Sequence, residues 1–416
     1  MNNAIFVLCL LMCLKTINEV VAGTTRWTRG KHSCTQTRDC VLNLKKDFGT
    51  PAPVFLKGNQ YLMPNAIDGS VLFKKSEAIL AACPGTKRFV VLNNDTTEFD
   101  AVKVSCQNDT TFTADAWSGQ FRDIKCSGQP WFSAEPTGQG CYDGGKMYRT
   151  GYKINNKFYK LYEACFNPDL LRTSYVRHKL TPQNKYFQTG HRPNFIEGAL
   201  FKKVKMSQVY KIENQKSRFN AILGDNKQAD YLTKKQYLTR GHLAARADFP
   251  LRAAQIASFH YVNTAPQWMR GNAGDWAALE EALRRRVHAI NATVDVITGT
   301  HGVTTLADSN GQDAEIYLHV DDNNNGVVPV PMYFYKLVYD PKRKASTAFV
   351  SINSSYHNAT ALEKLTFCND VCAGNSDLSW MTWRQNDGTT SFCCSYEEFV
   401  KHVDYLPTLN VKQLFY

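Results

Sequence analysis

The alternation of apolar and polar positions divides the chain into a strand-rich first part and a second part that mixes strands with helices. In the first part, short β-type runs such as 88–92 and 111–113 are separated by Gly, Asn, Asp and Pro turns. Further along, 256–262 and 294–298 read as strands, and 327–339 reads as a longer one interrupted by two prolines. The pattern therefore predicts an α+β protein.

One segment of the second part has a helical period. Its apolar residues recur at spacings of 3, 4, 4 and 3, which places them on one stripe of a helix. Asn272 and Asp275 precede the stripe as a capping-box-like start, so the helix is expected to begin near residue 272. The stripe consists of Trp276, Leu279, Leu283, Val287 and Ile290.

Composition excludes two classes of protein. The chain has 416 residues, 43% of them hydrophobic, which is enough for two or three domains with their own cores. Charged residues make up 21% and aromatic residues 12%, so the chain is not a disordered polycation. After the N-terminal segment, no stretch approaches the roughly 20 apolar residues of a membrane-spanning helix.

The first 22 residues read as a cleaved signal peptide. An apolar block from Ile5 to Leu14 is followed by small residues before Gly23, which fits a signal-peptidase site. Cleavage would remove Cys9 and Cys13. Sequons for N-glycosylation agree modestly with an exported glycoprotein; they lie at Asn94, Asn108, Asn291, Asn353 and Asn358.

The remaining eleven cysteines indicate disulfides in an oxidising compartment. A zinc site built from Cys368, Cys372, Cys393 and Cys394 is the alternative, but that spacing suits tetrahedral ligation poorly. An odd count leaves one thiol over, and Cys34 is our candidate. Because no cysteine lies between residues 165 and 368, we expect a Cys-rich, β-rich domain over 23–170 and a second domain over 171–416.

Positive charge is concentrated in one segment. The whole chain carries a formal net charge of +12, and residues 171–240 contain 15 Lys and Arg against 4 acids, a local net charge of +11. Nine Tyr and Phe residues are interleaved with these cations. Clustered cations with aromatics are typical of a polyanion-binding surface, although a solvated basic face over an aromatic core is the alternative.

Three motifs follow this basic segment in order. Thr239-Arg240-Gly241-His242 comes first, Asn263-x-x-Pro-Gln267 second, and a longer pattern third. The third is Asn272-x-x-x-Trp276-x-x-Leu279-Glu280-x-x-x-Arg284. Together they resemble the DNA/RNA non-specific endonuclease family, with the nearest likeness to extracellular duplex-specific nucleases of crustaceans. The resemblance implies a ββα-metal nuclease domain with a central mixed or antiparallel sheet and flanking helices.

The resemblance also implies a base and a metal ligand. His242 would be the general base, since an imidazole with a pKa near ~6.5 is largely neutral at pH 7. Asn272 would be the single protein ligand for Mg²⁺, which keeps much of its hydration and prefers oxygen; Mn²⁺ would substitute. The alternative for Asn272 is an ordinary helix N-cap.

Further roles carried over from the family concern charge and orientation. Glu280 would act through a water, since it would lie ~12 Å along the axis from a helix start at 272. Arg240 and Arg284 would neutralise phosphate charge, and Asn263 would orient His242 or the substrate. The family often has Asp before Arg-Gly-His, where this chain has Thr239; Asp248 is the one candidate to replace that carboxylate.

These features predict a secreted, Mg²⁺-dependent endonuclease that cuts DNA, preferring duplexes, with little sequence specificity and 5′-phosphate products. The alternatives are a sugar-non-specific nuclease that also takes RNA, and a non-catalytic secreted polyanion-binding protein. A calcium loop at 321–326 is a weaker candidate, because Met332 stands where such a loop needs Glu and a polar hairpin explains the pattern as well. Oligomeric state is left open.

Overall fold

The computed structural model describes residues 38–201, 204–354, 356–381, 383 and 390–416. The expected signal peptide and Cys34 lie outside these residues. Among the described residues, no helix is both long and apolar enough to cross a membrane.

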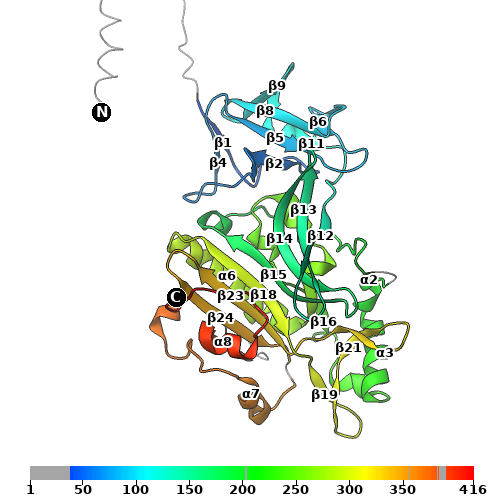
Figure 1. The fold of residues 1–416 in the computed structure, drawn as a ribbon. Helices are drawn as coiled ribbons and strands as arrows, with labels where there is room; N and C mark the ends of the chain where they lie inside the picture. Colours follow the sequence, from blue (N-terminus) through cyan, green and yellow to red (C-terminus); the bar gives the residue numbers. More distant parts are fainter. Residues whose placement is uncertain (1–37, 202–203, 355, 382, 384–389) are drawn as a thin grey trace, which may run out of the picture. The chain divides into compact units, whose positions relative to one another are not determined.

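Residues 38–132, here called the β-region, are built from short strands in three small sheets (Figure 1). The strand-like runs expected at 88–92 and 111–113 both lie in it. The first sheet pairs β1 (Cys40–Leu42) with β4 (Val71–Phe73). The second has the order β10 (Trp117–Gln120), β9 (Thr111–Ala114), β8 (Ala101–Asn108), β5 (Ala78–Ala82), β2 (Val54–Lys57) and β3 (Gln60–Tyr61). The third has the order β11 (Ile124–Cys126), β6 (Val90–Leu92) and β7 (Asp95–Thr96).

An eight-stranded sheet follows, and all its strand pairs are antiparallel. Three of its strands precede residue 170 and five follow it, so the sheet continues across the boundary expected from the cysteine spacing. The strand expected at 294–298 is present, and the 327–339 run is divided at its prolines. The order is β12 (Ser133–Gly140), β13 (Lys146–Ile154), β14 (Lys157–Asn167), β15 (Arg172–Leu180), β18 (Val294–His301), β23 (Tyr333–Asp340), β24 (Ala345–Ile352) and β25 (Thr390–Ser395).

Helices cover both faces of this sheet. The predicted apolar stripe of α6 (Asp275–Ala289) packs on one face, against residues such as Val296 and Phe334. On the opposite face, Phe399 of α8 (Tyr396–His402) packs against Tyr335 and Leu337. Because neighbouring strand residues point to opposite faces, adjacent positions on β23 serve two separate cores.

The other helices and hairpins surround this core. The helices are α2 (Met206–Val209), α3 (Ile212–Leu223), α4 (Arg252–Ala257), α5 (Met269–Ala273) and α7 (Ala359–Leu365). The 3₁₀ turns are η1 (Phe121–Asp123), η2 (Pro182–Lys185), η3 (Lys227–Asp230), η4 (Arg246–Asp248), η5 (Tyr261–Asn263) and η6 (Ser376–Leu378). Three strand pairs complete the fold: β16 (Leu238–His242) with β17 (Thr264–Trp268), β19 (Thr305–Ala307) with β20 (Asp313–Glu315), and β21 (Tyr317–Val320) with β22 (Gly326–Pro329).

Two sequence predictions about these elements are wrong. The run 256–262 is the end of α4 followed by η5, because a short apolar run buried on all sides has no strand-specific period. The long helix begins at Asp275 and not near 272, since Gly274 takes a non-helical backbone conformation between α5 and α6. Asn272 therefore lies inside α5 and does not cap α6.

Ten cysteines are paired in five disulfides, which confirms the disulfide prediction over the zinc alternative. The bridges are Cys40–Cys106, Cys83–Cys126, Cys141–Cys165, Cys368–Cys394 and Cys372–Cys393. Four of the five sequon asparagines are exposed. The fifth, Asn353, is buried, and its Nδ2 donates to the carbonyls of Pro266 and Pro331 at 3.0 and 2.9 Å.

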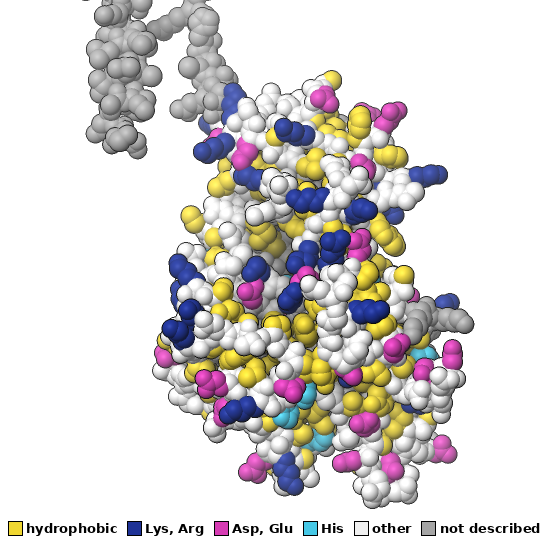
Figure 2. Space-filling view, in the orientation of Figure 1, with side chains coloured by type: hydrophobic (Ala, Val, Ile, Leu, Met, Phe, Trp, Pro, Cys, Tyr) yellow, Lys and Arg dark blue, Asp and Glu magenta, His cyan; other side chains and the backbone are white. Residues whose placement is uncertain are grey.

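The β-region contacts the segment that leads into the second half of the chain. The Tyr186 hydroxyl donates to the Ile67 carbonyl at 2.7 Å, and Gln188 Nε2 donates to the Leu44 carbonyl at 3.0 Å. The displayed face is hollowed in its middle, and Lys and Arg side chains gather around that hollow (Figure 2). A hollow of about 1040 Å³ is lined by residues of both parts, among them Lys57 and Lys179, which form ion pairs with Glu77 and Asp295.

Candidate active site

The β16–β17 pair positions the first two sequence motifs side by side. Its antiparallel register sets Thr239 opposite Gln267 and His242 opposite Thr264. A side chain at Gly241 would place its Cβ 2.8 Å from Gln267 Cβ, closer than real Cβ contacts allow. Glycine beside His242 is therefore required by the close approach of Gln267.

His242 is buried between aromatic rings. The ring centroids of Phe195 and Phe259 lie 5.0 and 4.8 Å from the imidazole centroid. Burial, together with the guanidinium groups of Arg192 and Arg246, lowers the pKa of His242 to about 3. Its Nε2 has no hydrogen-bond partner within the described part of the chain. The imidazole is thus neutral at pH 7.

Asn263 holds the backbone that follows His242. Its Nδ2 donates to the carbonyls of Ala244 and Ser258, and its Oδ1 accepts from the Ala244 N–H. Its own carbonyl accepts from the Leu243 N–H. Every polar atom of the side chain is bonded to backbone, so Asn263 fixes the loop after His242.

Asn272 lies at the same place as His242, on a different element. Two adjoining hollows of about 680 and 350 Å³ are both lined by Asn272, His242 and Arg192. The amide Nδ2 of Asn272 donates to Thr239 Oγ1 at 2.9 Å. Its Oδ1 has no hydrogen-bond partner among the described residues. One free amide oxygen, beside space for several waters, fits the donor set of a hydrated Mg²⁺.

Glu280 lines the smaller hollow together with His242 and Asn272. Burial raises the pKa of its carboxyl to about 7, and the nearby Asp248 adds to this, while the cations Lys336 and Arg284 oppose it. Glu280 therefore titrates close to neutral pH.

Arg284 is placed behind the hollows. Its Nη1 donates to Asp248 Oδ1 at 2.8 Å, and Asp248 Oδ2 lies 2.9 Å from His178 Nε2. Burial opposes ionisation of Asp248, but His178 and Arg284 outweigh it and hold the pKa of that carboxyl well below its ordinary value. Arg284 lines neither hollow, so it would not contact a phosphate bound there directly.

Arg240 lines the larger hollow. Its Nε donates to the Tyr261 hydroxyl at 3.0 Å, and its guanidinium lies 5.0 Å from the Tyr210 ring centroid. Neither Arg240, Arg192 nor Arg246 forms an ion pair with an acid among the described residues. This contrasts with the paired lysines of the 1040 Å³ hollow and leaves three cations available for an anion.

Sequence reasoning missed several residues of this site. Arg192 lines both hollows but was counted only as one cation of the basic segment. Lys336 is fully buried on β23, and its Nζ donates to Thr298 Oγ1 at 2.6 Å. A lysine inside an apolar strand pattern was the one available signal for it. Arg246 comes shortly after the first motif but was given no role, and Phe195 and Phe187 belong to no motif.

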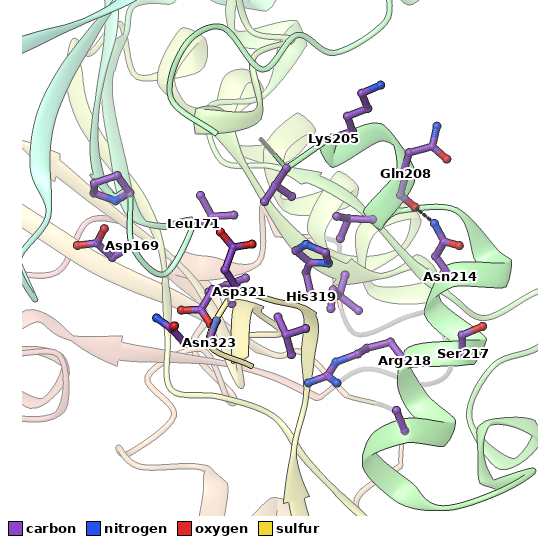
Figure 3. A pocket seen from close by; sticks show the side chains of 18 residues that line it. Asp169, Leu171, Lys205, Gln208, Asn214, Ser217, Arg218, His319, Asp321 and Asn323 are labelled. Carbon is purple, nitrogen blue, oxygen red and sulfur yellow. Dashed lines mark hydrogen bonds between the residues drawn. The ribbon is translucent and has the colours of Figure 1, made fainter. Parts of the chain in front are cut away.

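A separate hollow of about 910 Å³ lies between α2, α3 and the β21–β22 hairpin. Figure 3 shows Asp321 beside His319, with Arg218 below them, among the side chains that line it. The Oδ1 of Asp321 accepts from the backbone N–H groups of Asn323 and Asn325. The segment considered as a calcium loop is thus a polar hairpin turn held by its own aspartate.

Comparison with known proteins agrees with this arrangement. A family model described as DNA/RNA non-specific endonuclease matches residues 143–401. The chain belongs to this endonuclease family. It is 29% identical to a salivary endonuclease of Lutzomyia longipalpis over 90% of this chain and 85% of that protein.

A second relative is the salivary protein Tsal2A of Glossina morsitans morsitans, 25% identical over 92% of this chain and 96% of that protein. Among solved structures, a chain of an EndoG/EndoGI complex matches this endonuclease with 18% identity and a TM-score of 0.34. That match covers 62% of this chain and 89% of the other.

Proposed function

We propose that the protein is a secreted, Mg²⁺-dependent endonuclease that hydrolyses phosphodiester bonds of DNA, preferring duplexes, with little sequence specificity. The observation that carries the proposal is the meeting of His242, Asn272 with its free Oδ1, and three arginines without ion-pair partners among the described residues at two adjoining hollows. Phosphodiester hydrolysis requires a base, a metal ligand and cations that neutralise the phosphate charge.

In this proposal His242 takes a proton from a water that attacks phosphorus in line with the departing 3′ oxygen. The neutral imidazole expected from its low pKa is the form that can act as a base. The bond from phosphorus to the 3′ oxygen breaks, the departing 3′ oxygen takes a proton from a second water, and a 5′-phosphate end is left. Asn272 would hold Mg²⁺, which would offset the negative charge that builds up on the phosphate.

The remaining residues act on charge and position. Arg240 and Arg192 bind the phosphate oxygens from the larger hollow. Glu280, in its ionised form, orders a water beside Asn272 from the smaller one. Arg284 is a positioning residue, because Asp248 holds it away from the hollows.

Recognition without sequence specificity follows from cations that contact the backbone and not the base edges. Binding should then weaken steeply with salt, since counterions released from DNA drive it. The crustacean resemblance supports a preference for duplex DNA, while the DNA/RNA description of the family keeps RNA cleavage as the second candidate.

Export is supported by five disulfides and by relatives named for saliva. Expression of the full chain in cultured eukaryotic cells tests it. We expect nuclease activity in the medium, and activity retained in the cells alone would contradict the proposal.

The central experiment compares plasmid DNA, single-stranded DNA and RNA as substrates of the purified protein with Mg²⁺ and with EDTA.

We expect His242→Ala to lower cleavage by about 10³-fold, the scale of a lost general base, with salt-sensitive DNA binding retained. Arg285→Ala is the matched control, because Arg285 is exposed on α6 and forms an ion pair with Glu281 away from the hollows. RNA cut as fast as duplex DNA would end the duplex preference. Failure of the unmodified protein to cut any substrate would make it a polyanion-binding protein.

A further inference from the structure

The hydroxyl of Thr239 connects the strand β16 to Asn272. Thr239 Oγ1 lies 2.9 Å from the Gln267 carbonyl oxygen and 2.9 Å from the amide Nδ2 of Asn272. A hydroxyl carries one proton, and a carbonyl oxygen can only accept. The proton of Thr239 is therefore committed to Gln267, and towards Asn272 the hydroxyl can only accept.

This decides which end of the Asn272 amide faces the hydroxyl. The group beside Thr239 Oγ1 must be the NH₂, because an amide oxygen there would meet another acceptor. The amide oxygen then points away from Thr239, and it has no partner among the described residues. Asn272 lines both hollows beside His242, so its oxygen is the donor presented to them.

We propose that Thr239 is a positioning residue that sets the Asn272 amide with its oxygen directed to a divalent cation. The inference rests on the proposed function, in which Asn272 is the metal ligand. It adds the reason why a neutral, freely rotating amide can serve as the single ligand: the hydrogen-bond chain from the Gln267 carbonyl through Thr239 removes the flipped orientation.

Thr239 does this without adding charge. An aspartate at the same position would also accept from Asn272 Nδ2 but would bring a negative charge towards the phosphate. With threonine the orienting bond is kept, and the cation is held by a neutral ligand. Metal affinity at this site should accordingly depend on the hydroxyl and not on the methyl group of Thr239.

The test is binding of Mn²⁺ to the metal-free full-length protein, followed by electron paramagnetic resonance in the absence of nucleic acid. Thr239→Val keeps the shape and removes the hydroxyl, so we expect about tenfold weaker Mn²⁺ binding, the low end of losses seen when a partner of a metal ligand is removed. Thr239→Ser keeps the hydroxyl and should bind Mn²⁺ within about twofold of the unmodified protein.

A double-mutant cycle with Asn272→Asp separates positioning from general damage. A carboxylate has two equivalent oxygens and no amide to orient, so Thr239→Val should lose less Mn²⁺ affinity in that background than the tenfold expected with asparagine. An equal loss in both backgrounds would overturn the inference, as would unchanged Mn²⁺ binding by Thr239→Val. If the valine variant does not fold, Thr239→Ala replaces it, and the same comparison with serine applies.

The outcome for the unmodified protein distinguishes the two proposals. If it binds Mn²⁺ and cuts DNA while Thr239→Val binds Mn²⁺ equally well, only the role of Thr239 is wrong. If the unmodified protein neither binds Mn²⁺ nor cleaves DNA with any divalent cation, the proposed function fails and the inference fails with it.

Discussion

The β-region and the part of the chain that carries the candidate active site are stabilised in different ways. The β-region has two disulfides and a cluster of phenylalanine rings, among them Phe55, Phe112 and Phe121. The segment from 171 to 300 contains no cysteine, and buried polar side chains such as Asn263 and Asp248 cross-link it through hydrogen bonds.

This difference indicates which substitutions should affect activity and which should affect stability alone. Covalent bridges tolerate small shifts of their surroundings, whereas a site held by single polar atoms loses its geometry when one of them changes. Substitutions in the β-region should therefore act mainly on stability, and substitutions around the site should act on activity as well.

The largest expected change in stability follows from removing the Cys83–Cys126 disulfide, whose cysteines are 43 residues apart in the β-region. Replacing both cysteines by alanine should lower the free energy of unfolding by about 4 kcal/mol, since the open chain regains loop entropy. Removing Cys372–Cys393 is the matched control and should cost about 1 kcal/mol, because Cys368–Cys394 still closes nearly the same loop. Urea unfolding measures both, and equal losses would contradict the argument.

Breaking the buried ion pair behind the site is the next test. Asp248→Asn leaves Arg284 buried without its counter-charge, so we expect a loss of about 3 kcal/mol in unfolding free energy. Cleavage should fall as well, because the substitution removes the negative charge of Asp248 that acts on Arg284 and on the carboxyl of Glu280. Glu281→Gln breaks only the exposed pair with Arg285 and should cost under about 0.5 kcal/mol. A purely structural role for Asp248 would leave the activity of the folded fraction unchanged.

The pH dependence of cleavage tests the role of one carboxyl of the candidate active site, that of Glu280. Burial raises the pKa of Glu280 to about 7, so the carboxyl is protonated below that pH and ionised above it. If the ionised form is needed, kcat/KM should fall about tenfold per pH unit below pH 7. A bound divalent cation favours the ionised form, so the midpoint should move down as Mg²⁺ rises. Glu280→Gln should abolish this limb; an identical limb in that variant would assign it to another group.

The smallest expected effect concerns the contact between the two regions. Tyr186→Phe removes the hydrogen bond to the Ile67 carbonyl and should cost about 0.5 kcal/mol in unfolding free energy. The adjacent residues Phe187–Gly190 line the smaller hollow, so a modest rise in KM should accompany it. Tyr339→Phe, which removes a hydroxyl bond to the Asn410 carbonyl far along the chain, is the control. A larger effect on KM from the control would refute the link.

Sequence patterns predicted the elements whose period is long and clear. The α6 stripe and the strand after it are confirmed, because each buries one continuous face. The strand expected at 256–262 is wrong, since buried alanines beside Ile256 fit helix and strand equally. The use of cysteines as bridges was predictable, but their pairing depends on which strands lie together.

For the site, the motifs indicated residues but not their partners. His242 and Asn272 line the same hollows, although one lies on a strand and the other on a helix. The spacing of Glu280 and Arg284 says nothing of Asp248, which comes from another element and pairs with Arg284. Arg192 has no local signal, because its importance arises only from where the fold places it.

The buried sequon has a consequence for how the chain is made. Attachment of a glycan to Asn353 would occupy the same amide nitrogen that donates to the Pro266 and Pro331 carbonyls, and would put a bulky polar sugar into the core. Pro266 belongs to the strand opposite Arg240, so a sugar there would separate β17 from the neighbouring sheet. Glycosylation of Asn353 and formation of this fold are thus mutually exclusive. Each chain that reaches this fold must carry Asn353 without a glycan.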